Sequence, residues 1–373
     1  MVVLTQKNYL AFSLAKKTII YYTYFTKTVG NRMIGWKVSE FGKIEKTKHQ
    51  EFLDGLDSVK IKLTRALVTE DDVAYIAGEE KSLKLPVIPV RFAVGQVSEV
   101  AQDNEFLKKG DRVVLSSVSP CGSCPSCESG APENCYNFSV AGKNVDGFLK
   151  DFAVTNLSNV YALPKSVKDA DAVYIEYVAL ALSVIDKLNV KKSSHVAIIG
   201  GNVFASILAQ ILIYYQAVPI LIDEKESNLR MAKKSGIYYT VSTNSKPEKE
   251  IASITGGRMA SSVVYVTRSN LNTELAYKIA SHNAPVVFAG YSYPTLRVPM
   301  NVALSKQIQT SCVNNGYGNY LAAINLLANK AIDLSTYALP ETKMDDIIPE
   351  VEKMVERFND KKPFNNLLVN LLD

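Results

Sequence analysis

Histidine is scarce in this chain, since only three occur among its 373 residues, at His49, His195 and His282. No run of apolar residues reaches the eighteen or more that a membrane-spanning helix needs. The basic residues form no stripe with interleaved aromatic residues of the kind that binds nucleic acid. The sequence therefore predicts neither a membrane partner nor a nucleic-acid partner.

Acidic residues are missing from the first 32 positions, which contain Lys7, Lys16, Lys17, Lys27 and Arg32. Those five account for the whole excess of 42 basic over 37 acidic residues, so the rest of the chain is neutral. This segment has three interpretations: an organellar targeting segment, an added strand or arm packed on the body, and a stretch upstream of a true start at residue 33. Its lysines in place of arginine and the β-prone run at 18–25 disfavour targeting. We expect a packed or dispensable extension on a cytoplasmic protein.

The whole chain has the size and composition of an enzyme with two ordinary domains, at 47% hydrophobic and 21% charged residues.

Four of its five cysteines fall within fifteen residues, at Cys121, Cys124, Cys127 and Cys135. Two intervening residues let neighbouring sulfurs converge on one metal ion about 2.3 Å away, and four thiolates leave no open coordination position. Two disulfides are the alternative, which lacks any sign of secretion to support it. The spacing predicts one structural zinc.

A strand, turn and helix pattern begins after the midpoint of the chain. Residues 194–200 are a short buried strand, and 206–215 have the apolar character of a helix packed on a sheet. A second strand, 218–223, ends in Asp223, which lies 23 residues after Gly200. At this offset a carboxylate accepts hydrogen bonds from an adenosine ribose and repels a 2′-phosphate. The pattern favours NAD(H) over NADP(H), although Lys225 and Arg230 lie nearby and a solvated turn residue is the alternative interpretation of Asp223.

The turn between that strand and helix departs from the Gly-x-Gly-x-x-Gly pattern of dinucleotide sites. It consists of Gly200, Gly201, Asn202, Val203, Phe204 and Ala205, so only the first of three glycines is kept. Ala205 merely fills the contact between helix and strand, whereas Asn202 brings a side chain to the place where backbone approaches a pyrophosphate. Because asparagine tolerates positive φ, the turn can still form. We expect a weakened cofactor site.

These motifs carry a resemblance to a known family. The cysteine loop is flanked by Gly-Asp-Arg-Val-Val at 110–114 and by Asp-Gly-Phe-Leu-Lys-Asp-Phe-Ala-Val at 146–154. Together they resemble the catalytic domain of zinc-containing medium-chain alcohol and polyol dehydrogenases, over residues 33 to 373. The resemblance implies an α/β fold in which a doubly wound Rossmann domain is inserted into a GroES-like β-barrel catalytic domain. The implied segments are an extension at 1–32, the catalytic domain at 33–175 with its zinc loop at 121–135, the Rossmann domain at 176–317 and a return to the catalytic domain at 318–373.

The resemblance also implies the later strands of the cofactor sheet. Residues 284–290 look like its fifth strand, which places Gly290 in the cofactor site, and 308–318 look like its last strand. An exposed edge of this kind is a template for pairing with a second copy. We expect self-association through this strand into a homodimer or a tetramer.

The family's catalytic zinc ligands are largely missing. Val68, Thr69, Glu70 and Asp71 stand where the family has a run beginning with cysteine, and Arg91 and Phe92 replace its His-Glu pair. Only Glu176 matches. One carboxylate beside an arginine cannot hold zinc, which needs three protein ligands in an open site. Neither Cys312 nor the three histidines fall near this place in the family layout.

Two functions remain open for Arg91, Glu70, Asp71 and Glu176. In one, Arg91 only neutralises Glu176 in a salt bridge, and the protein is a non-catalytic relative that keeps the fold for assembly or ligand sensing. In the other, the protein is an NAD(H)-linked oxidoreductase acting on an alcohol, aldehyde or enone. Hydride then moves directly from the nicotinamide to an activated acceptor such as a conjugated carbonyl, while Arg91 stabilises the oxyanion and Glu70 or Asp71 handles the proton. The small-molecule substrate is not identified by the sequence.

Overall fold

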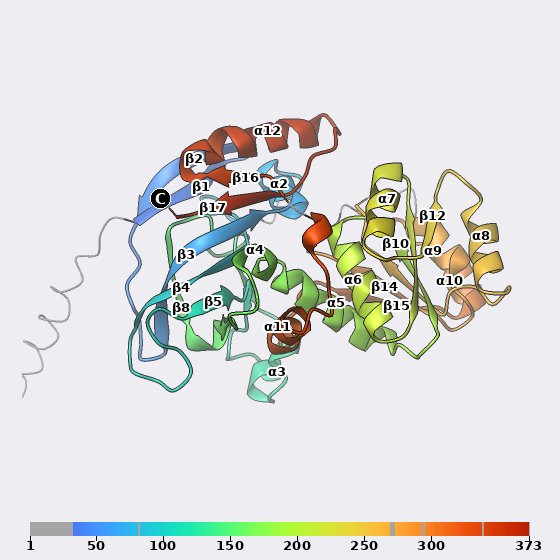
Figure 1. Cartoon of the computed structure of the whole chain (residues 1–373), viewed down its shortest axis with the longest axis horizontal. Coiled ribbons are helices and arrows are strands. Elements are labelled where there is room, and N and C mark those ends of the chain that lie inside the picture. Colours follow the sequence, from blue (N-terminus) through green and yellow to red (C-terminus); the bar gives the residue numbers. More distant parts are fainter. Residues whose placement is uncertain are drawn as a thin grey trace, which may run out of the picture.

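The computed structural model describes residues 33–80, 83–268, 273–291, 293, 295–337 and 339–372, so the interpretations of 1–32 lie outside the described residues. Two lobes lie next to each other along the long axis of the molecule (Figure 1). In the described part of the chain, no helix has both the length and the apolar character to cross a membrane.

The first lobe is built on a seven-stranded sheet in the order β16-β17-β3-β4-β5-β9, with β8 also paired to β3. The long central strand β3 is mostly buried, because neighbouring strands and helices cover it. The strands are β3 (Ser58–Val68), β4 (Phe92–Val100), β5 (Arg112–Leu115), β8 (Phe152–Asn156), β9 (Val160–Ala162), β16 (Glu341–Lys343) and β17 (Leu367–Asn370).

A hairpin of β1 (Met33–Glu40) and β2 (Lys43–His49) flanks this sheet, and helix α12 (Ile347–Asn359) lies over it (Figure 1). Within the described residues the first strand thus begins at Met33, where the resemblance places the start of the catalytic domain. The segment after 318 returns to this lobe through β16, α12 and β17.

The second lobe holds a six-stranded parallel sheet in the order β12-β11-β10-β13-β14-β15. Its strands are β10 (His195–Ile199), β11 (Val218–Asp223), β12 (Tyr239–Ser242), β13 (Ser262–Tyr265), β14 (Pro285–Ala289) and β15 (Gln309–Val313). This is the doubly wound order, in which the strand sequence reverses between β10 and β13.

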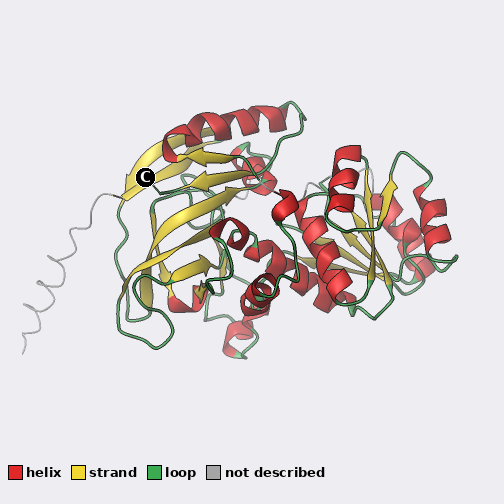
Figure 2. Ribbon diagram, in the orientation of Figure 1, coloured by secondary structure: helices red, strands yellow, loops and turns green. Residues whose placement is uncertain are grey.

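Helices cover both faces of this sheet (Figure 2). One face packs on α6 (Val203–Tyr214) and α7 (Glu226–Lys234). The other packs on α8 (Pro247–Ile254), α9 (Thr273–Ile279) and α10 (Met300–Lys306). The inner strands β10, β11, β13 and β14 are largely apolar because neither of their faces meets water.

Helix α5 (Ile175–Leu188) joins the two lobes. Its buried residues belong to one continuous core with Leu67 and Phe92 of the first sheet, with α6, and with α11 (Tyr320–Ala328). The fit is tight at Gly316, where an added Cβ would lie 2.5 Å from the Cβ of Ala179 on α5. The boundary between the lobes is therefore a packed interior.

Candidate functional site

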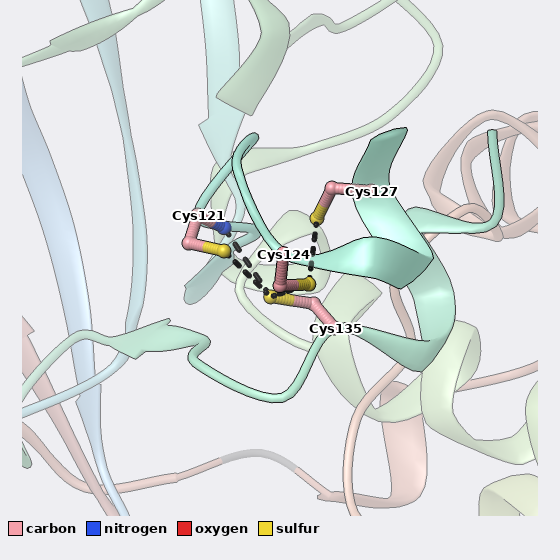
Figure 3. A group of neighbouring side chains, drawn as sticks. All are labelled: Cys121, Cys124, Cys127 and Cys135. Atoms are coloured by element: carbon pink, nitrogen blue, oxygen red, sulfur yellow. Dashed lines mark hydrogen bonds between the residues drawn. The ribbon is translucent and has the colours of Figure 1, made fainter. Parts of the chain in front are cut away.

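The cysteine loop lies between two short strands, β6 (Val118–Ser119) and β7 (Ser139–Val140), which pair with each other. Helix α3 (Pro125–Glu128) starts directly after Cys124 and turns Cys127 back toward it. The four side chains point toward one another from this loop (Figure 3). Their sulfur atoms all lie within 4.8 Å of each other.

The distances between the sulfurs match a four-thiolate metal site. They are 3.5 Å for Cys124 to Cys127, 3.9 Å for Cys124 to Cys135 and 3.6 Å for Cys135 to Cys121. Four sulfurs arranged tetrahedrally about 2.3 Å from zinc are separated by roughly 3.8 Å. Backbone N–H groups of Cys127 and Tyr136 lower the pKa of the Cys124 thiol to about 6, whereas burial raises the pKa of the Cys127 thiol to about 12. The residues fit a closed structural zinc site.

A cleft of about 230 Å³ separates the lobes at the carboxyl ends of the parallel strands. From the second lobe it is lined by Gly200, Gly201, Asn202, Val203, Phe204, Asp223 and Gly290, and from the first by Glu70 and Asp71. Ala205 lies behind this wall and is fully buried. Arg91 and Glu176, the other two sequence candidates, are not among the lining residues and are 1% and 2% exposed.

Asn202 works differently in the structure than the sequence suggested. Its φ is −72°, so the tolerance of asparagine for positive φ plays no part there. The side chain caps helix α6 by accepting a hydrogen bond from the N–H of Ala205 at 2.9 Å, and its Nδ2 donates to the carbonyl of Val266 at 3.3 Å. Positive φ is needed instead at Gly200, at +113°. An anion that approaches the start of α6 therefore competes with Asn202 for the N–H of Ala205.

Asp223 braces the same turn. One carboxylate oxygen accepts a hydrogen bond from the N–H of Gly201 at 2.6 Å. The other accepts from the N–H of Lys225 at 2.7 Å and from Nδ2 of Asn228 at 3.1 Å. Since a carboxylate offers about four acceptor positions, room for a further donor remains at the cleft.

Arg91 pairs with a different acid from the one that the sequence suggested. Its Nε lies 3.8 Å from Oδ1 of Asp72, and its guanidinium packs on the rings of Tyr291 and Tyr75, at 4.3 and 5.2 Å from their centroids. The interpretation of an Arg91–Glu176 salt bridge is therefore wrong. The Asp72 carboxylate is held by the N–H and the hydroxyl of Thr69, at 2.8 and 2.6 Å, in the capping box that starts α2 (Glu70–Ile76). The spacing from Thr69 to Asp72 was the sequence signal for this partner.

Glu176 is held by hydroxyl groups. It accepts hydrogen bonds from the hydroxyls of Tyr291, at 3.2 Å, and Tyr320. The N–H of Ser117 lies at 3.4 Å. Burial raises the pKa of Glu176 from its usual 4.5 to about 7, although the bond from Ser117 and the charge of Arg91 oppose the rise. The carboxyl is therefore half protonated near neutral pH.

Comparisons with known proteins decide the family. The alcohol dehydrogenase GroES-like domain matches residues 55–165, and the zinc-binding dehydrogenase domain matches residues 205–329. The chain belongs to the zinc-type medium-chain alcohol dehydrogenases. This confirms the predicted family and the predicted fold, a GroES-like lobe joined to a Rossmann lobe.

The individual relatives of this chain are distant. An uncharacterized zinc-type alcohol dehydrogenase-like protein of Haemophilus influenzae is 24% identical over 293 residues, which cover 78% of this chain and 86% of that protein. The crystal structure of the Escherichia coli alcohol dehydrogenase RspB in complex with NADH has a TM-score of 0.81 at 20% identity and covers 91% of this chain and all of that one. A zinc-binding dehydrogenase of Sinorhizobium meliloti bound to NADP has a TM-score of 0.79 at 18% identity, covering 91% and 99% of the two chains.

The residues of this chain do not fit the family's catalytic zinc. Glu176 offers one oxygen ligand, which two tyrosines already engage, and the place of a second ligand holds the cation of Arg91. Aromatic rings fill the space toward the cleft, with Phe92 packed edge-on against Tyr177 at 4.7 Å and against Tyr291 at 5.7 Å. Within the described residues, the only cluster of three or more His, Cys, Asp or Glu side chains with metal-binding geometry is the cysteine loop.

Arg268 follows β13 and lines the cleft, and no pattern in the sequence predicted it as a site residue. Its guanidinium forms ion pairs with Asp71, at 3.2 Å, and with Glu79, so it connects the two lobes. Burial raises the pKa of Asp71, while Arg91 and Arg268 oppose the rise. No local motif marked Arg268, because its partners lie almost 200 positions earlier in the chain.

Proposed function

We propose that the protein is an NAD(H)-dependent oxidoreductase that carries one structural zinc and works without catalytic zinc. The observation that supports this most directly is Asp223, which lines the cleft next to the glycine turn at the start of α6. The fold neighbours that bind NADH and NADP support a nicotinamide cofactor. The cysteine loop supports the structural zinc, which would hold its part of the lobe together.

NAD(H) is proposed over NADP(H) on charge. The carboxylate of Asp223 has acceptor positions left for ribose hydroxyls, and it would repel a 2′-phosphate. Glu224 adds a second negative charge to this wall of the cleft, against the single positive charge of Lys225.

Bound nicotinamide would supply the hydride, and this chain's own residues would handle the proton. Glu70 and Asp71 are the sequence candidates that line the cleft, so we propose one of them as the proton donor or acceptor. Arg91 remains a predicted oxyanion donor, but its burial between Tyr75 and Tyr291 supports a role in holding Asp72 and the aromatic cluster.

A second candidate is a non-catalytic relative that binds a ligand without turnover. One observation favours this second candidate: the guanidinium of Arg91 and tyrosine rings fill the position where the family has its catalytic metal. Its ligand would be the same dinucleotide, since the glycine turn and Asp223 are independent of that place.

Titration with NADH and NADPH followed by thermal unfolding tests the cofactor. We expect NADH to raise the melting temperature at lower concentration than NADPH, because a ligand of the native state stabilises it. Asp223→Ala should weaken NADH binding about tenfold, since one hydrogen bond to a charged acceptor is lost. It should also narrow the preference for NADH over NADPH, because the carboxylate that repels the 2′-phosphate is gone. An unchanged preference would remove Asp223 from the cofactor site.

A screen of aldehydes, ketones and enones with NADH separates the two candidates. Turnover that is lost in Glu70→Gln or Asp71→Asn supports the enzyme. NADH binding without turnover of any compound supports the non-catalytic relative.

Self-association through β15 is proposed as well. This strand is an edge of the six-stranded sheet, and Gln309, Thr310 and Cys312 on it are exposed. Helix α10, directly before it, exposes Met300 and Leu304. An unpaired edge next to exposed apolar residues favours a second copy as the partner.

A further inference from the structure

Arg268 lies where the two lobes and the cleft meet. Its side chain is 16% exposed and lines the cleft, and it forms ion pairs with two acids of the other lobe. Asp71 is in the first turn of α2, and Glu79 follows that helix. Arg268 thus connects the Rossmann lobe that carries it to the first lobe.

The segment of Arg268 is packed directly against the glycine turn. A Cβ added to Gly200 would lie 3.0 Å from the backbone nitrogen of Thr267, the residue before Arg268. A pyrophosphate bound at the start of α6 would therefore lie close to the origin of the Arg268 side chain.

Two of the backbone donors in the turn are already engaged by side chains. The N–H of Gly201 donates to Asp223, and the N–H of Ala205 donates to Asn202. Glu70, Asp71, Asp223 and Glu224 surround the cleft with negative charge, while its cations are Lys225 and Arg268. A pyrophosphate in this acidic cleft therefore gains from a side-chain cation beside the turn.

We propose that Arg268 binds the pyrophosphate of the dinucleotide and that it leaves Asp71 and Glu79 to do so. This inference rests on the proposed dinucleotide site and adds the residue that sets its affinity. The two carboxylates compete with the ligand for one guanidinium, so each of them weakens binding. By linkage, the bound dinucleotide weakens the ion pairs between the lobes by the same factor.

Glu79→Gln gives the sharpest test, because Glu79 pairs with Arg268 but does not line the cleft. We expect this variant to bind NADH several-fold more tightly than the wild type, and Arg268→Gln to bind it at least tenfold more weakly, as for loss of a charged hydrogen bond. ADP-ribose, which carries the pyrophosphate without nicotinamide, should show the same changes. Glu274→Gln is the matched control, since it breaks the exposed ion pair with Lys278 on α9 and should leave both dissociation constants unchanged.

The outcomes separate this inference from the proposed function. Equal NADH affinity of the wild type, Glu79→Gln and Arg268→Gln would overturn the role of Arg268 and leave the cofactor in place. Binding by Glu79→Gln alone would support the competition and show that the wild type excludes the dinucleotide. Absence of binding by every protein, with zinc content and circular dichroism unchanged, would overturn both. Arg268→Lys keeps the charge if the glutamine variant does not fold.

Discussion

The first lobe contains two places where its family binds zinc, and this chain treats them in opposite ways. The cysteine loop keeps four sulfurs at distances that suit a metal ion, although no core surrounds it. The place of Arg91 and Glu176 is almost wholly buried and has a guanidinium, a carboxylate and aromatic rings instead. We propose that a metal holds the surface loop together, whereas the interior place is filled by side-chain packing.

The contrast indicates which of the two zinc sites this fold can lose without losing stability. A short loop without a core has no other source of stability once its metal is gone. A buried place between two lobes can be filled by side chains from both, here Arg91 from the first lobe and Tyr291 from the second. The hydrogen bond from the hydroxyl of Tyr75 to the carbonyl of Tyr291, at 3.0 Å, adds to the same contact.

Removal of the structural zinc should have the largest effect. We expect about one zinc per chain, and Cys127→Ser should unfold residues 121–135 and destabilise the first lobe by more than about 5 kcal/mol, because binding energy of a structural zinc is folding energy. Elemental analysis and limited proteolysis measure this. Cys312→Ser is the control, as that thiol is exposed on β15. Two tightly bound zinc ions per chain would contradict the contrast between the two places.

Loss of Arg91 should have the next largest effect. Arg91→Met leaves the buried Asp72 without its cation, and we expect a loss of about 3–5 kcal/mol in the free energy of unfolding by urea. Adding Asp72→Asn should restore more of this stability than adding Glu176→Gln, since Asp72 is the ion-pair partner. If Glu176→Gln restored more stability than Asp72→Asn, Glu176 and not Asp72 would be the ion-pair partner of Arg91. Lys278→Met, at an exposed pair, should cost less than about 1 kcal/mol.

Because of Glu176, the free energy of unfolding should decrease as the pH rises. Its pKa in the folded protein is about 7 against 4.5 in the unfolded chain, so between these values only the folded state keeps the proton. Stability therefore decreases as pH rises from 4.5 to 7, by on the order of 3 kcal/mol in all, and levels off above pH 7. Unfolding of the wild type and Glu176→Gln across this range checks it. The difference in stability between the two proteins should change by that amount, and a constant difference would show that Glu176 is ionised throughout.

Local patterns in the sequence predicted much of the fold. The strand at 218–223 is found at its predicted limits, and the helix expected from 206 begins three residues earlier, at Val203, because Asn202 caps it. The cysteine loop was predictable because its ligands are neighbours in the chain. Each of these features depends on residues a few positions apart.

The interior contacts could not be predicted in the same way. Asp72, Arg91, Glu176 and Tyr291 come from four separate segments, and their pairing depends on how the lobes pack. The family layout brought Arg91 and Glu176 together, but it does not specify which acid forms the pair. The capping box fixes the carboxylate of Asp72 near Arg91, while tyrosines take up Glu176.

The contact of Gly316 with α5 has a consequence for variation in this protein. A side chain at this position would meet Ala179 and the backbone of Leu180 within 2.6 Å, so even alanine would act as a wedge between helix and loop. Helix α5 also carries Glu176 and packs on both lobes, so the wedge would tilt one lobe against the other. A single methyl group at Gly316, which lies outside the cleft, would therefore change the width of the cleft. Any residue larger than glycine at this position would alter the angle between the two lobes.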